Sequence, residues 1–119
     1  MIKIKSIISI VLLFSFSFNV YSDVKIPTIK EYTNDTSGFY DSYIYGVESG
    51  LEWAAEHYYR KYEIELYCKP RNIKLPVAKL REMINNVIQS KPSFFKKYDN
   101  EPLVGLALRN GYIQKFPCQ

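Results

Sequence analysis

The sequence predicts an all-α protein, a small bundle of about four helices closed by one disulfide bond. Three observations favour this class. Apolar residues recur at spacings of three and four over long segments, as on one face of a helix. No convincing strand alternation is present beyond the first residues after the leader. The chain contains two cysteines, Cys68 and Cys118, so one intramolecular bridge can form.

Residues 1–22 have the pattern of a cleavable signal peptide. A basic start, Met1 to Lys5, is followed by an apolar uncharged stretch and by Ser22, a small residue at the expected cut. The alternative is a membrane anchor, but the apolar run is shorter than the ~20 residues that span a bilayer. We therefore expect export to the periplasm and no stable membrane insertion after cleavage. In that oxidising compartment the two cysteines would be bonded.

The composition disfavours several function classes. Loss of Lys3 and Lys5 with the leader lowers the formal net charge from +4 to +2, which is close to balanced. A basic patch at Lys69, Arg71, Lys74 and Lys79 is weak support for nucleic-acid binding, and export weakens it further. We expect no nucleic-acid partner.

Residues 23–37 form a polar, turn-rich arm with a short apolar start, which is either loosely packed or disordered. A long helix is expected from Phe39 to Glu63. Its apolar stripe, expected to face the core, comprises Phe39, Tyr43, Val47, Leu51, Ala54, Tyr58 and Tyr62. Beside it, Gly46, Gly50 and Ala54 suggest that another helix crosses closely.

Three further helices follow the connection that contains Cys68. Pro76 suits the first turn of a helix that ends near Ser90, before Pro92. Residues 92–98 can form a short third helix. Asn100 is a good N-cap for a fourth, which Gly111 is expected to end or weaken. A bridge from Cys68 to Cys118 encloses about 50 residues and would stabilise the fold by roughly 4 kcal/mol.

No residue pattern indicates catalysis. His57 is the only histidine. A Cys–His pair is disfavoured because a disulfide leaves no free thiol, and one histidine with scattered carboxylates does not make a metal ligand set, so we expect no catalytic residue, metal or cofactor. Glu48, Glu52 and Glu56 share one helix face, which is either a solvated acidic face or a surface for a basic partner. Tyrosine is unusually frequent, and exposed tyrosines favour protein interfaces.

Several segments together carry a family resemblance that covers Tyr40 to Cys118. They are Tyr45-Gly46-Val47-Glu48-Ser49-Gly50, then Tyr67-Cys68-Lys69-Pro70-Arg71-Asn72-Ile73-Lys74-Leu75, the helix from Val77 to Ile88 leading into Lys91-Pro92, Leu103-Val104-Gly105-Leu106-Ala107-Leu108, and Phe116-Pro117-Cys118. In this order they resemble the Rap/Tai family of type VI secretion immunity proteins.

The resemblance implies that residues 38–119 form a periplasmic immunity domain with a disulfide. The best-known branch of this family binds a peptidoglycan amidase toxin and occludes its active site with a protruding loop, often as a homodimer. Two positions depart from the family pattern. Lys74 stands where a capping Ser or Thr is usual, and Gly105 where a helix former is usual. The capping of the second helix is therefore in doubt, and the identity of the toxin does not carry over.

We expect the partner, a secreted effector toxin, to contact loops between helices and the exposed residues of the first helix. The expected contact residues are Tyr98, Asp99, Asn100, Glu52, Glu56 and Tyr59. The alternative function is a small periplasmic helical chaperone or ligand-binding module, which would need an apolar surface that becomes exposed under some condition.

Overall fold

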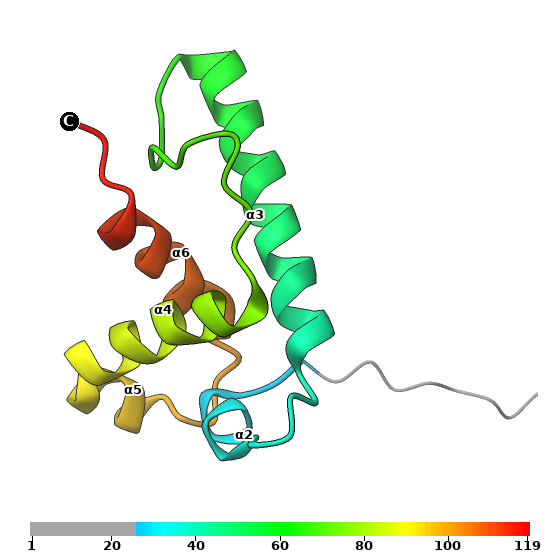
Figure 1. Cartoon of the computed structure of the whole chain (residues 1–119). Coiled ribbons are helices and arrows are strands. Elements are labelled where there is room, and N and C mark those ends of the chain that lie inside the picture. Colours follow the sequence, from blue (N-terminus) through cyan, green and yellow to red (C-terminus); the bar gives the residue numbers. More distant parts are fainter. Residues whose placement is uncertain (1–25) are drawn as a thin grey trace, which may run out of the picture.

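The computed structural model describes residues 26–119, so the expected signal peptide at residues 1–22 lies outside it. The described chain is all-α, as predicted, and contains no strand between residues 26 and 119. Figure 1 shows its helices, which are α2 (Ile29–Asn34), α3 (Asp41–Tyr62), α4 (Val77–Ser90), α5 (Pro92–Lys97) and α6 (Val104–Lys115). None of the helices in this part of the chain is both long and apolar enough to cross a bilayer.

The arm after the leader contains an ordered helix, α2. The Thr28 hydroxyl accepts from the Glu31 backbone N–H, and the Glu31 side chain accepts from the Thr28 N–H, which makes a capping box. Ile29 and Tyr32 are buried, and the Lys30 N–H donates to the Asp99 carbonyl at 2.8 Å. The Thr-x-x-Glu pattern was the sequence signal for this helix, and the expectation of a loose or disordered arm overlooked it.

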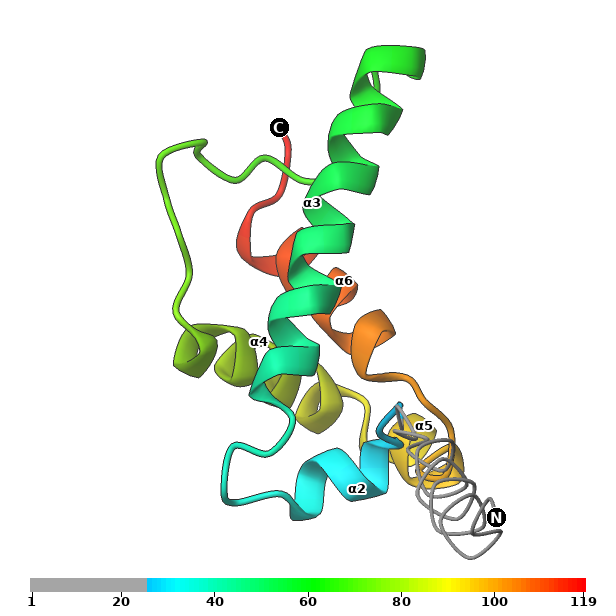
Figure 2. The same ribbon diagram turned by 90° about the vertical axis from the view of Figure 1, so that its right-hand side faces the viewer.

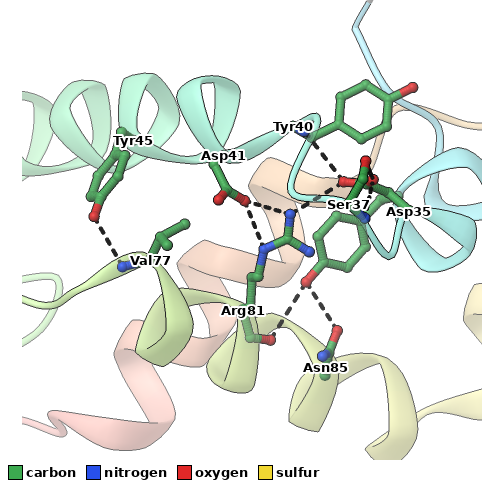
Figure 3. A network of polar contacts seen from close by, with 9 residues as sticks. Asp35, Ser37, Tyr40, Asp41, Tyr45, Val77, Arg81 and Asn85 are labelled. Carbon is green, nitrogen blue, oxygen red and sulfur yellow. Dashed lines mark hydrogen bonds and ion pairs between the residues drawn. The ribbon is translucent and has the colours of Figure 1, made fainter.

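A polar network fastens α2 and the start of α3 to α4 (Figure 3). Arg81 Nε donates to Asp41 Oδ1 at 2.8 Å, and the guanidinium also donates to Asp35 Oδ2 at 3.2 Å. Burial alone would raise the pKa of the Asp35 carboxyl. Hydrogen bonds from Ser37, the Tyr40 N–H and Arg81 outweigh it and hold that pKa well below its usual range. The network is structural, because its charged and polar groups form hydrogen bonds with one another.

The core is one cluster formed mainly where α4 and α6 meet. Its buried apolar members are Ile29, Tyr32, Ile44, Leu80, Met83, Ile84, Val87, Phe95, Val104, Ala107, Leu108 and Tyr112. Gly111 lies inside α6 rather than at its end, and it allows α6 to approach the α4 backbone. A Cβ at this position would lie 3.1 Å from Met83 Cβ and 3.2 Å from the Met83 carbonyl oxygen. The close helix crossing is therefore at Gly111 and not at Gly46 and Gly50, where a Cβ would meet nothing within 4 Å.

Helix α3 is longer than the core that it covers. It has 22 residues against 14 in α4 and 12 in α6, or about 33 Å against about 21 and 18 Å at the usual helical rise. Ile44 is its one buried residue. From His57 to Tyr62 every side chain is exposed, so the expected core stripe is wrong at Tyr58 and Tyr62. It is also wrong at Ala54, which is exposed, and at Phe39, which lies before the helix. The end of α3 projects beyond the other helices (Figure 1).

The predicted disulfide is confirmed. The sulfur atoms of Cys68 and Cys118 lie 2.01 Å apart, and the Cys68 N–H donates to the Phe116 carbonyl at 2.7 Å. The bridge therefore joins the segment after α3 to the tail after α6.

Candidate protein-binding surface

The segment from 63 to 76 folds back beside α3 and leaves a cleft between them. Glu63 begins the reversal in the left-handed region, at φ 55, while its N–H still donates to the Tyr59 carbonyl. The disulfide holds the middle of the segment. At its far end the Val77 N–H donates to the Tyr45 hydroxyl at 3.0 Å. The segment is thus fixed at three points, and the cleft has a defined shape.

The cleft has a volume of about 790 Å³ and is lined by α3 on one side and the returning segment on the other. The α3 wall contributes Glu48, Glu52, Glu56 and the aromatic residues Tyr45, Trp53 and Tyr59. The opposite wall contributes Tyr67, Lys69, Arg71 and Lys74. An acidic wall therefore faces a basic one, with aromatic rings on both.

One ion pair connects the two walls. The Lys69 side chain is only 9% exposed, and its Nζ lies 2.5 Å from Glu52 Oε1. The same ammonium donates to the Ile73 carbonyl at 3.0 Å, which also braces the returning segment. An ammonium this deeply buried requires such partners, because an unpaired buried charge is costly.

Two tyrosines lie beneath this ion pair with their rings 4.8 Å apart, and they differ in their hydrogen bonding. The Tyr112 hydroxyl donates to Glu48 Oε1 at 3.0 Å, whereas the buried Tyr67 hydroxyl has no hydrogen-bond partner among residues 26–119. Burial, and then the nearby glutamate charges, raise the pKa of both phenols. Both groups stay neutral at physiological pH.

At the end of the cleft, the projecting last turns of α3 and the first residues after it carry exposed apolar side chains, which we call the aromatic tip: Tyr58, Tyr59, Tyr62, Ile64 and Leu66. These side chains are between 38% and 51% exposed. The rings of Tyr58 and Tyr62 contact each other with centroids 4.8 Å apart, and Lys61 Nζ lies 5.3 Å from the centre of the Tyr62 ring. Tyrosines of this kind offer a large contact area at a low entropy cost.

The structure divides the six predicted contact residues into two groups. Glu52, Glu56 and Tyr59 line the cleft together. Tyr98, Asp99 and Asn100 lie between α5 and α6, at the opposite end of the molecule (Figure 1). There Asp99 lines a second pocket, of about 390 Å³, beside α2, and its carbonyl holds α2. The two groups do not form one surface.

Sequence reasoning missed the basic wall as part of the site. The sequence shows Lys69, Arg71 and Lys74 only as a basic patch around Cys68, and the folded position of the returning segment sets them opposite the glutamates. Trp53 and the residues Ile64 and Leu66 were also not singled out. One signal in the sequence could have indicated these residues. A bridge at Cys68, soon after a long helix, requires the chain to reverse there, and the reversed segment then lies beside the helix.

The arrangement is suited to binding. In residues 26–119, the one group of three side chains spaced to hold a metal ion is Glu65, Cys68 and Cys118. Its sulfurs are bonded to each other and are therefore not thiolate ligands. His57 is exposed on α3.

Comparison of the sequence with protein-family models and with curated proteins, and of the structure with solved structures, finds no match.

Proposed function

We propose that this protein is a periplasmic immunity protein that binds a type VI secretion toxin, a peptidoglycan amidase, and occludes its active site. The observation that carries the proposal is the aromatic tip, which projects from the body beside a cleft with charged walls. A narrow exposed ridge of tyrosines can enter a substrate groove. The glutamates and the lysine and arginine side chains beside it can pair with charges at the rim of that groove.

Three further features support the proposal. The sequence begins with a signal-peptide pattern, and its motifs resemble the Rap/Tai family. The disulfide and the two hydrogen bonds from Cys68 and Val77 hold the returning segment against the body. A surface fixed in this way loses little conformational freedom on binding, and this favours tight inhibition.

The test is protection of cells that express a candidate amidase toxin targeted to the periplasm, chosen from genes that lie beside this one. The native protein should prevent killing, and a Tyr59→Ala, Tyr62→Ala double variant should not, because loss of central aromatic contacts costs ~2 kcal/mol or more each. Tyr98→Ala is the matched control, an exposed aromatic residue of 38% exposure at the opposite end of the molecule.

Killing that the native protein does not reduce would refute the proposal for that toxin. Protection that survives loss of the tip tyrosines but fails in Tyr98→Ala would move the interface to the connection between α5 and α6. Circular dichroism of each variant checks that folding is unchanged.

A further inference from the structure

The cleft between α3 and the returning segment contains charged groups that the described chain leaves unpaired. It is lined by four glutamates and four basic residues, so its formal charge is balanced. Two of the basic side chains pair with glutamates of α3 at 2.5 Å each. Within residues 26–119, Arg71 and Lys74 have no acidic partner, and Glu65 has no basic one. These three groups are available to a ligand that carries both signs of charge.

A tight turn holds the two unpaired cations in place. The Ile73 N–H donates to the Pro70 carbonyl at 3.2 Å, and the Lys69 ammonium donates to the Ile73 carbonyl at 3.0 Å. Arg71 lies inside this turn and Lys74 follows it directly. A planar guanidinium can bind both oxygens of a carboxylate, and a neighbouring ammonium adds another donor. The turn therefore offers a site for one carboxylate group.

The α3 wall of the cleft can hold the rest of such a ligand. Tyr45, Trp53 and Tyr59 line this wall, and Trp53 is 69% exposed. Tyrosine and tryptophan give a large contact area to peptide groups at a low entropy cost. From Tyr45 to Tyr59 the helix rises about 21 Å, the length of an extended peptide of about six residues. The cleft volume of about 790 Å³ lies within the usual range for a ligand site.

The two ends of the cleft differ in charge. The turn lies toward the end where the Val77 N–H donates to the Tyr45 hydroxyl. Glu65 lies toward the other end, two residues after Glu63, whose N–H donates to the Tyr59 carbonyl. Figure 2 shows the returning segment leaving the end of α3 and standing away from the helix before it reaches α4. A ligand that lies along the segment would meet cations at one end and a carboxylate at the other.

We propose that this cleft binds a short zwitterionic peptide, with its C-terminal carboxylate at Arg71 and Lys74 and its ammonium group toward Glu65. Two sources share this chemistry: free oligopeptides and the released stem peptides of peptidoglycan. The proposal goes beyond the proposed function, because it concerns binding inside the cleft of the free protein and requires no toxin. Loss of peptide binding and loss of toxin inhibition are therefore separate results.

The test is calorimetric titration of the purified, disulfide-bonded protein with the peptide Ala-Ala-Ala-Ala. The fluorescence of Trp53, the only tryptophan, is followed in parallel. We expect binding with a change in the Trp53 emission. The C-terminal amide of the same peptide should bind ~10-fold more weakly or worse, because it lacks the charge that Arg71 recognises.

Matched variants locate the carboxylate. Arg71→Gln should weaken binding of the free acid by the same factor and should leave binding of the amide unchanged. Arg109→Gln, the same substitution at an exposed position of α6 outside the cleft, should bind like the native protein. Circular dichroism of both variants checks the fold.

A stem tetrapeptide of peptidoglycan distinguishes the two sources. Tighter binding than that of Ala-Ala-Ala-Ala would assign the cleft to cell-wall peptides, and equal or weaker binding would assign it to oligopeptides in general. Absence of both heat and Trp53 change with either peptide, up to ~10 mM, would overturn the proposal. Equal affinity for acid and amide, or unchanged affinity in Arg71→Gln, would also overturn it, because the turn would then not hold the carboxylate.

Discussion

Replacing glycine by alanine at Gly111 and at Gly50 should change stability in opposite directions. Both residues lie inside helices, so each substitution gains up to about 1 kcal/mol of helix propensity. At Gly111 the new methyl group would lie 3.1 Å from Met83 Cβ and 3.2 Å from its carbonyl oxygen, so α4 and α6 must separate. Overpacking of this kind costs ~1–3 kcal/mol, which leaves a net loss of up to ~2 kcal/mol after the gain in propensity. At Gly50 the new methyl group would meet no atom of the described chain within 4 Å, so the gain in helix propensity is not offset by a clash.

The assay is denaturant unfolding at low protein concentration, with thermal melts followed by circular dichroism. Gly111→Ala should lower Tm, by up to about 8–16 °C for a loss of ~2 kcal/mol, and Gly50→Ala should raise it by up to about 4–8 °C, given ~4–8 °C per kcal/mol for a domain of this size. Gly105→Ala is the intermediate control, because its methyl group would make an ordinary 3.5 Å contact with Val47 Cγ1. If Gly111→Ala stabilised the protein as Gly50→Ala does, the close crossing of α4 and α6 would be wrong.

Three further predictions test the cleft, the bridge and the alkaline limit. Tyr112→Phe removes a hydrogen bond to a carboxylate and should destabilise by ~1.5–3 kcal/mol, whereas Tyr67→Phe removes an unpartnered buried hydroxyl and should be neutral or stabilising; equal losses in unfolding free energy would contradict this. Replacing Cys68 and Cys118 by serine should lower the free energy of unfolding by ~4 kcal/mol, because the bridge closes a loop with a sequence separation of 50. An unchanged denaturant midpoint of unfolding would contradict this. Burial, partly offset by the nearby Arg81 charge, raises the pKa of Tyr32 to about 12. The stability that the neutral Tyr32 phenol contributes should therefore be complete below pH ~10 and be lost as the pH rises toward about 12. In an alkaline titration, the absorbance of the Tyr32 tyrosinate should appear at the same pH at which the protein unfolds.

The fold class could be predicted because most helices have a local signal. The start of the last helix was predicted wrongly, since α6 begins at Val104 with Leu103, not Asn100, as its N-cap. Periodicity, Pro76 and Pro92 placed α4 and its end, and the two cysteines set the bridge. The glycines could not be assigned in the same way. A glycine inside a helix indicates close approach, but it does not say to what, and the partner of Gly111 is fixed only by the crossing of α4 and α6.

The candidate site was predicted in part for a related reason. Periodicity gives the face of α3 that holds Glu52, Glu56 and Tyr59, yet it does not say where the core stops. The length of α3 relative to α4 and α6 decides that its last turns are exposed. The basic wall depends on a long-range reversal of the chain, which no local pattern encodes.

The most direct test of the proposed inhibition is a peptidoglycan hydrolysis assay with a purified amidase toxin that this protein protects cells against. The proposal predicts that hydrolysis falls to background when one equivalent of this protein is added, and that the Tyr59→Ala, Tyr62→Ala variant fails to inhibit at the same ratio. Undiminished hydrolysis with an excess of the folded, disulfide-bonded protein would contradict it.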